Sequence, residues 1–527
     1  MPFSRYIREA LAHTEEKGCD TMGLFGRKKQ VPPPHPRQEP RIDCPVTADG
    51  ITEVFRDCAD FGRRTLYLNN DPERQVEMLY IVGQVRNERA SDYVLRPLTQ
   101  NEALRRASTM DEAFDLMAKG GLYTFAVEVR TTADQVVFDL IDGWVALFFP
   151  GKKQVITFMT ATEEKRSVSN PENEPDIKGA RDSFVESIRT NTSLVRRRLR
   201  SPSLKIKEQL VGRQSVTPVD ILWLDGIADP ALAREVEQRI REIDIDSMLM
   251  TGNFEQYIVK ERRTAFPMTA YTERPDRFCA GLSEGRVGVV VDGIPMGWLF
   301  PATFDSFFRT GQDSSAGWAI ASVLTVLRYL CMLLTLFLPG LYVAAVLFHP
   351  ELIPVKLTLS IIAAKANVPF ATLTEILVML FAFEVLQEAG LRLPTSIGQT
   401  VSILGGLVVG SAAVEAKLVS PAVLVVVAIA GISGYTAPSQ DFAGAIRIWR
   451  FLLTVASGIF GMVGLILGGM VLVYRLARLE SFGVAYLTPF ASNAGKQTEG
   501  HTVLRQPLTD AKTRPDYLNT KNRRNQG

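Results

Sequence analysis

A stretch of apolar sequence that ends in GLVVGSAAVEAKLVSP (406–421) carries hydroxyl and carboxylate side chains at regular intervals. On a helix, Thr400, Ser411 and Glu415 share one face, because steps of three and four residues connect them. A carboxylate within an apolar segment is costly and usually faces protein or water. If several copies gathered around an axis, this face would form rings of hydroxyls and a carboxylate, which is the chemistry of a cation pathway.

A structural interpretation of the same residues stays open. Glu415 and Lys417 would then mark the membrane surface, while Ser411 and Thr400 would bond to neighbouring helices. On the residue types alone this interpretation is the favoured one. In either case a pair of glycines four residues apart, Gly406 and Gly410, would let another helix pack closely on this segment.

Two further groups of charged side chains are candidates for function. Glu375 and Glu384 lie in PFATLTEILVMLFAFEVLQEAG (369–390), which fits a helix at an interface or one that lines water. A helix expected at 181–200 ends in a cluster of arginines. These side chains either form a solvated helix end or bind anionic lipid head groups or a neighbouring subunit: Arg196, Arg197, Arg198 and Arg200.

Motifs of catalysis are missing from the sequence. It contains no Ser/His/Asp order, HExxH motif, P-loop or paired catalytic acids, so we expect neither an enzyme nor a cofactor. The five cysteines form no CxxC pair and the four histidines are scattered, so neither a disulfide framework nor a metal site is indicated. The net charge of +2 comes without a basic stripe, which argues against nucleic acid as a partner.

An apolar block near the C-terminus must position the polar face. The chain has 46% hydrophobic and only 22% charged residues, a lean balance for a soluble protein. A bilayer core needs about 20 consecutive apolar residues. We therefore predict a transmembrane domain over 309–480 with about four to five membrane segments: 329–348, 369–390, 401–416, 418–438 and 451–474.

The membrane segments are not equally well supported. The first and last, 329–348 and 451–474, are long enough to cross, whereas crossing by 369–390 and 401–416 stays open. Four crossings are the simplest arrangement if the N-terminal region and the basic tail are both cytoplasmic. The last segment carries small residues at helical spacing, a face on which another helix can pack: Ser457, Gly461, Gly464 and Gly468.

The polar N-terminal part contains an internal repeat with an offset of about 142 residues. YIVGQV (80–85) parallels LWLDGI (222–227), and LIDGWVALFFPG (140–151) parallels LSEGRVGVVVDG (282–293). Each copy predicts a buried strand, two helices and a hairpin, and in the second copy Pro275 suits the first turn of the second helix.

The expected fold class is therefore α/β plus an α-helical membrane domain. Two duplicated mixed α/β soluble subdomains, 42–165 and 202–308, precede the multi-pass helical domain, and a linker helix lies in 166–201. A basic, proline-rich leader (1–41), in which Met22 is a second possible start, is expected to be disordered. The tail (481–527) is expected to be cytoplasmic and largely disordered.

Several long motifs, taken together and in order, resemble the A-subunit family of spore germinant receptors. They cover roughly residues 60–492: ESIRTNTSLVRRRL, YTERPDR, EGRVGVVVDGIP, PATF, FHPELIP, QEAGLRLPTSIGQTVSILGGLVVGSAAVEAKLVSP and ESFGVAYLTPF. Ala180 and Ser183 depart from the family pattern, which often has proline and glycine there, so the paralogous branch is left open.

The resemblance implies a multi-pass protein of the spore inner membrane with its N-terminal region in the spore core. It implies two partners, a transporter-like B subunit that binds the nutrient and a lipoprotein C subunit. It also implies a homo-oligomer that forms a nutrient-gated channel releasing monovalent cations, which favours the pore over the interfacial interpretation. The alternatives are a non-conducting membrane scaffold and the sporulation-stage paralogue that amplifies germination.

Overall fold

The computed structural model describes residues 42–120, 126–161, 171, 174, 176, 178–248, 254–392, 410–490, 504–505, 507–510 and 512–525. The predicted leader lies outside these residues, and so do Thr400 and Gly406. Ser411 and Glu415 lie within them.

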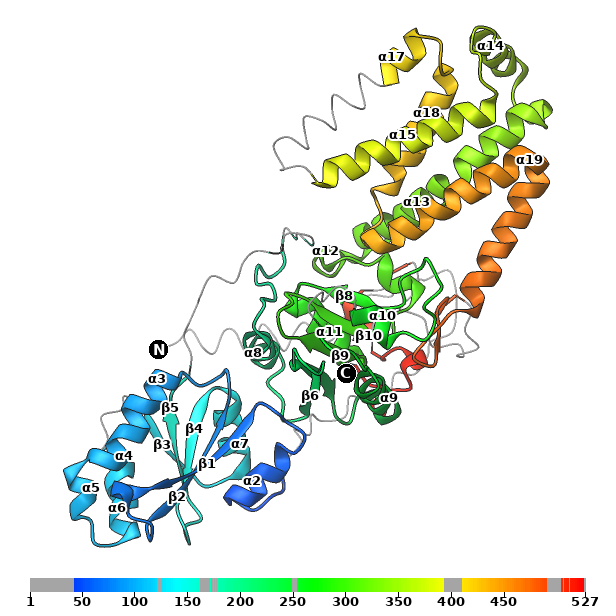
Figure 1. Cartoon of the computed structure of the whole chain (residues 1–527). Helices are drawn as coiled ribbons and strands as arrows, with labels where there is room; N and C mark the ends of the chain where they lie inside the picture. The colour runs from blue at the N-terminus through cyan, green and yellow to red at the C-terminus, as the bar shows by residue number, and fades with distance from the viewer. Residues whose placement is uncertain are drawn as a thin grey trace, which may run out of the picture. The chain divides into compact units, whose positions relative to one another are not determined.

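The first α/β subdomain is built on a five-stranded antiparallel sheet with helices on both faces (Figure 1). The strand order is β1-β2-β4-β5-β3, with bounds Phe61–Tyr67, Gln75–Ile81, Trp144–Phe148, Val155–Met159 and Val127–Arg130. Neighbouring side chains of β2 enter opposite cores: Leu79 packs with α2 (Ala48–Val54) and α7 (Ala133–Ile141), and Met78 with the helices on the other face. Those helices are α3 (Asn87–Ala90), α4 (Arg96–Gln100), α5 (Glu102–Arg106) and α6 (Met110–Ala118).

The second subdomain has a sheet of the same order, β6-β7-β9-β10-β8. Its strands span Leu204–Val211, Thr217–Leu224, Val287–Val291, Gly297–Phe300 and Ala270–Thr272. Corresponding strands, such as β1 and β6, begin about 142 residues apart along the chain. The hairpin between β9 and β10 turns at Asp292–Gly293, where Gly293 has a φ of 83° that favours glycine. Helices cover both faces of this sheet: α9 (Pro230–Arg241), α10 (Phe254–Ile258) and α11 (Pro275–Glu284).

Helix α8 (Ile188–Arg198) corrects the predicted linker helix. Ile188 and Val195 are buried in the core that α11 and the second sheet share. Because burying these side chains fixes the helix against the sheet, α8 belongs to the second subdomain, in the place that α2 takes in the first. The second subdomain therefore begins before residue 202.

Residues 311–478 form the helical part of the chain (Figure 1). Its helices are α12 (Gly311–Ser315), α13 (Trp318–Leu347), α14 (Val355–Lys365), α15 (Thr372–Arg392), α17 (Gly410–Glu415), α18 (Pro421–Gly434) and α19 (Gln440–Arg478). Among the described residues, two helices, α13 and α19, are long and apolar enough to cross a membrane. The segment predicted at 418–438 forms a helix of 14 residues, or roughly 21 Å, which is shorter than a bilayer core.

Helix α19 is broken at Gly461, which corrects the continuous segment predicted at 451–474. Gly461 has φ 62° and ψ −141°, a conformation close to glycine-only, and the ribbon reverses part of its course there (Figure 1). A Cβ on Gly464 would lie 2.2 Å from the carbonyl oxygen of Ala456, and one on Gly468 would lie 2.5 Å from Leu453. Gly464 and Gly468 of the predicted small-residue face thus pack against the first arm of α19, while Ser457 donates to the carbonyl oxygen of Gly340 in α13.

The described part of the tail is ordered, which contradicts the expectation of a largely disordered segment after residue 480. Strands β11 (Glu480–Ser481) and β12 (Val484–Ala485) form a small hairpin. Phe482 packs in the core of the second subdomain, and Tyr517 is also buried. These two aromatic side chains are removed from water only when the second subdomain is folded. The sequence around them therefore does not show that this part of the tail is ordered.

Candidate functional site

The residues of the expected polar membrane face lie partly on one short helix. Ser411 and Glu415 are exposed on α17 (Gly410–Glu415), and Gly410 is buried against Leu424 of α18. Thr400 and Gly406 lie outside the described residues. The structure thus places a hydroxyl and a carboxylate on the exposed side of α17, one turn apart.

The turn that follows α17 is anchored by a buried carboxylate. Lys417 has a φ of 56°, and the chain enters α18 through Ser420 and Pro421. The backbone N–H of Ser420 donates to a carboxylate oxygen of Glu375 at 3.0 Å, and the Lys365 ammonium lies 3.8 Å from the other oxygen. Glu375 therefore does not face water: it holds the first turn of α18 in place, which corrects its expected position on a polar face.

Glu384 is also paired within the chain. Its carboxylate binds the guanidinium of Arg447 at 3.1 Å and forms a second ion pair with Arg450. Arg450 is buried, whereas Glu384 and Arg447 are partly exposed, and the contact joins α15 to α19. The charge expected to line water is thus neutralised by helix α19, because two arginines of that helix come within reach only when the helices pack.

One arginine of the predicted cluster, Arg196, differs from both interpretations, whereas Arg197, Arg198 and Arg200 are exposed at the end of α8, as a solvated helix end requires. Arg196 and Asp60 are both 1% exposed, and Arg196 Nη2 donates to Asp60 Oδ1 at 2.8 Å. This contradicts a lipid or solvent contact for Arg196, because the ion pair lies between α8 and the start of β1. Arg198 pairs with Asp182, and Arg200 lies 3.1 Å from Asp142. Arg197 also has an interaction partner.

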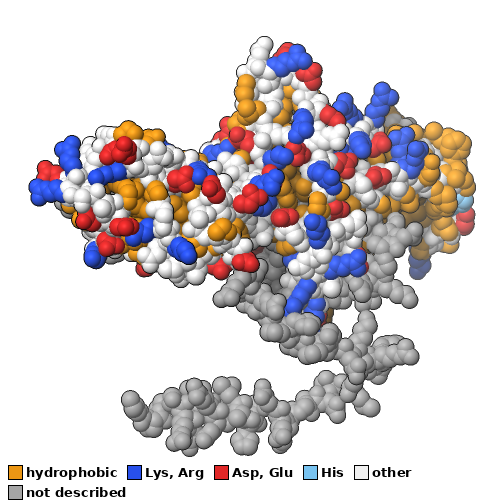
Figure 2. All heavy atoms as spheres, turned by 90° about the horizontal axis from the view of Figure 1, so that it is seen from below, with side chains coloured by type: hydrophobic (Ala, Val, Ile, Leu, Met, Phe, Trp, Pro, Cys, Tyr) orange, Lys and Arg blue, Asp and Glu red, His pale blue; other side chains and the backbone are white. Residues whose placement is uncertain are grey.

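The exposed side of the helical part is apolar. Val378, Phe381 and Val385 are exposed on α15, and Ile459 and Phe460 on α19. Figure 2 shows hydrophobic side chains gathered over the helical part, at the right of the view. Helices that pair their charges inside and expose apolar side chains are typical of a lipid environment or of an interface between subunits.

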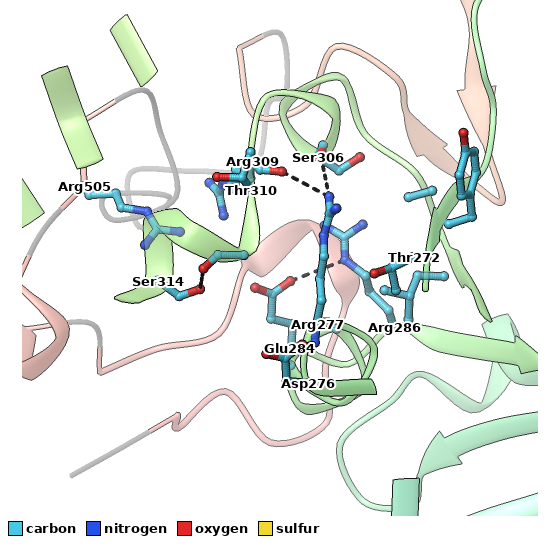
Figure 3. Close-up of a pocket in the computed structure, with 16 residues that line it drawn as sticks. Thr272, Asp276, Arg277, Glu284, Arg286, Ser306, Arg309, Thr310, Ser314 and Arg505 are labelled. Atoms are coloured by element: carbon cyan, nitrogen blue, oxygen red, sulfur yellow. Dashed lines mark hydrogen bonds and ion pairs between the residues drawn. The ribbon is translucent and has the colours of Figure 1, made fainter. Parts of the chain in front are cut away.

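Sequence reasoning missed a cavity of about 400 Å³ that contains several arginines (Figure 3). The segments that line it are β8, α11 with Arg286 after it, Leu299 of β10, residues 306–314 before α13, and the tail. Its charged side chains are Asp276, Arg277, Glu284, Arg286, Arg309 and Arg505. No local motif could have shown this cavity, because the arginines lie up to about 230 residues apart in the chain.

Hydrogen bonds and an ion pair hold two of the arginine side chains that line the cavity in place. Arg277 forms an ion pair with Glu174 and donates to the carbonyl oxygens of Ser306 at 3.3 Å and Arg309 at 3.1 Å. Arg286 donates to the carbonyl oxygen of Pro301 at 2.8 Å. Helix α11 and the segment before α13 are thereby joined by side chains that are already in place before any ligand binds.

Comparison with known proteins gives consistent matches over most of the chain. The family described as Bacillus/Clostridium GerA spore germination protein matches residues 49–517. The chain is 33% identical to spore germination protein KA of Bacillus subtilis (strain 168) over 495 residues, 93% of this chain and 90% of that protein. It is 36% identical to spore germination protein B1 of the same strain over 446 residues, 84% of this chain and 91% of that protein.

Two further similarities were found. Spore germination protein GerLA of Bacillus cereus is 32% identical over 444 residues, 84% of this chain and 89% of that protein. A crystal structure of the N-terminal domain of the A subunit of the Bacillus megaterium spore germinant receptor GerK3 is similar at 27% identity and a TM-score of 0.38. That likeness covers 50% of this chain and 97% of that one.

Proposed function

Because this chain belongs to the GerA family of spore germination proteins, we propose that several copies of it assemble in the spore inner membrane into a nutrient-gated cation channel. The α/β subdomains face the spore core in this arrangement. A transporter-like B subunit binds the nutrient, and a lipoprotein C subunit completes the receptor. Opening of the channel releases monovalent cations at the start of germination.

The observation that supports a channel between copies is the distribution of polar groups in the helical part. Glu375 and Glu384 are occupied by partners inside the chain, whereas the Glu415 carboxylate is exposed at the end of α17. An exposed carboxylate next to apolar helices is costly in lipid. Facing an axis shared with other copies would surround this carboxylate with water and cations, as in the charged rings of cation channels.

Cation flux from liposomes tests the channel directly. The full chain, alone and with its partner subunits, is reconstituted, and release of potassium is recorded with an ion-selective electrode. Flux that requires the oligomeric fraction supports the proposal. No flux in any oligomeric state, with or without partners, refutes it.

A single substitution then tests the role of Glu415. Glu415→Gln removes the charge of the proposed ring, so we expect slower cation release and later germination. Glu351→Gln is the matched control, because Glu351 is also an exposed carboxylate in the helical part but lies outside α17. Equal effects of the two substitutions would show that Glu415 only marks the membrane surface.

The alternative function, a non-conducting scaffold, is separated by water accessibility. Single cysteines are placed at positions 400, 404, 407, 411 and 415, and at control positions between them, and are labelled with a membrane-impermeant reagent. Labelling at every position of this face, but not at the positions between, supports a pore. Uniform protection supports a packed anchor whose α/β subdomains bind partners.

A further inference from the structure

The cavity shown in Figure 3 lies where the second subdomain meets the first membrane-length helix. Helix α11 forms one side, and Ser306 to Ser314, which lead into α12 and α13, form another. Arg505 of the tail closes a third side. A group bound here would contact all three segments at once.

Most of the positive charge around the cavity is already balanced. Three of its four arginines form ion pairs with carboxylates of the second subdomain or the segments next to it. These pairs are Arg277 with Glu174, Arg286 with Glu284 at 3.3 Å, and Arg309 with Asp305 at 2.6 Å. Such pairs leave little net charge for a ligand.

Arg505 is the exception among the described residues that line the cavity. Its backbone N–H donates to the Ser322 hydroxyl at 2.9 Å, and its Nη1 donates to the carbonyl oxygen of Asp313 at 2.6 Å. The Asp313 carboxylate is occupied by Arg328 at 2.6 Å. No described carboxylate lies within ion-pair distance of Arg505, although the more distant carboxylates of Asp313, Asp305 and Glu284 act to raise its pKa.

The electrostatics around Arg505 favour an added anion. Burial, and after it the nearby positive charge of Arg309, lower the pKa of Arg505. A charged guanidinium that is partly buried gains from an added anion, because the anion offsets the cost of its desolvation. The Thr310 hydroxyl is engaged elsewhere, because it takes part in the capping box of α12 with Asp313 and accepts from Arg328 Nη2 at 3.4 Å.

We propose that this cavity binds a phosphate-bearing anion, held by the Arg505 guanidinium. The planar fork of a guanidinium matches two phosphate oxygens, and about 400 Å³ is enough for a phosphate ester. The cavity lies just before α13, so the phosphate comes either from solution or from a lipid head group. In both cases it fixes the tail to the start of α13, which goes beyond the channel proposed above.

Thermal unfolding of the full chain tests the proposal and separates the two sources. In detergent, inorganic phosphate is titrated at constant ionic strength, with chloride as the reference anion. In nanodiscs, phosphatidylglycerol is compared with phosphatidylcholine. We expect a saturating rise in Tm with phosphate in detergent, or a higher Tm in phosphatidylglycerol.

Substitution of Arg505 shows whether the effect belongs to this cavity. Arg505→Gln should weaken the apparent affinity for the anion about tenfold or more, since it removes a charge-assisted hydrogen bond pair, while Arg505→Lys should retain part of it. Arg213→Gln is the control, because Arg213 is an exposed arginine on the same subdomain and outside the cavity.

The other possible results of these experiments would overturn the proposal. A Tm that responds to neither phosphate nor phosphatidylglycerol overturns the proposal, and so does an anion effect that Arg505→Gln leaves unchanged. If Arg505→Gln does not fold, Ser314→Glu replaces it, because Ser314 is exposed at the cavity wall. The added carboxylate should abolish the phosphate effect, and a phosphate effect that persists in Ser314→Glu also overturns the proposal.

Discussion

Replacing Asp60 by asparagine tests how strongly the two α/β subdomains are joined. Asp60 and Arg196 are each 1% exposed, and their ion pair connects the start of β1 with α8 of the second subdomain. Asp60→Asn keeps the shape of the side chain but removes its charge, so the Arg196 guanidinium stays buried without a counter-ion. Breaking a buried ion pair in this way costs about 3–5 kcal/mol.

The cost is large enough to measure on the full chain in detergent by differential scanning fluorimetry. With a shift of roughly 2–4 °C for each kcal/mol in a unit of 150–250 residues, Tm should fall by about 6 °C or more. Glu53→Gln is the control, because Glu53 pairs with Arg56 on the surface and such pairs contribute about 1 kcal/mol or less.

A double substitution makes the test stricter. Asp60→Leu combined with Arg196→Met removes both charges and should be nearer to the wild type than Asp60→Asn is, because an apolar pair can replace a buried ion pair at little cost. If Asp60→Asn changes Tm no more than Glu53→Gln does, the two charges are not desolvated. The inference that this pair locks the subdomains together would then be refuted.

Three other changes have expected outcomes. Gly461→Ala should lower the Tm of the detergent-solubilised chain by the equivalent of about 1–3 kcal/mol. The backbone conformation of Gly461 disfavours a side chain, and a Cβ there would lie 2.8 Å from the Phe348 ring. An unchanged Tm would argue against the break in α19. Burial raises the pKa of Asp220 to about 7. The folded chain therefore keeps a proton on this carboxyl group that the unfolded chain loses above about pH 4. The free energy of unfolding should accordingly fall as pH rises from about 4 to 7. Asp220→Asn should flatten that slope in unfolding measured across pH, and an identical slope would contradict the buried carboxyl. Glu384→Gln should destabilise the helical part by about 3 kcal/mol or more in the same thermal assay, because Arg450 then stays buried without a carboxylate; a loss below about 1 kcal/mol would show that water reaches this pair.

Much of the soluble fold can be predicted from the sequence because its signals are local. The Asp292–Gly293 turn, the proline that begins α11 and the alternation of buried residues in β2 each depend on a few neighbouring residues. The offset of about 142 residues links the two strand patterns without any knowledge of the fold. Short-range backbone preferences and period-two burial decide these features.

The roles of the charged candidate residues could not be assigned from the sequence, because their partners lie far away in the chain. Arg196 lies 136 positions from Asp60 in the chain, and Glu384 lies 63 and 66 positions from its two arginines. An isolated charge in an apolar or helical pattern looks the same whether it faces lipid, water or a counter-ion. Only packing determines which partner comes within about 4 Å of it.

Sequence alone determined that this chain joins repeated α/β units to apolar helices, because composition and periodicity report directly on burial and on secondary structure. Tertiary structure alone decided that Glu375 holds a turn, that Gly461 divides α19, and that arginines from distant segments share one cavity. Those features depend on contacts between segments far apart in the chain, and such contacts exist only once the chain has folded.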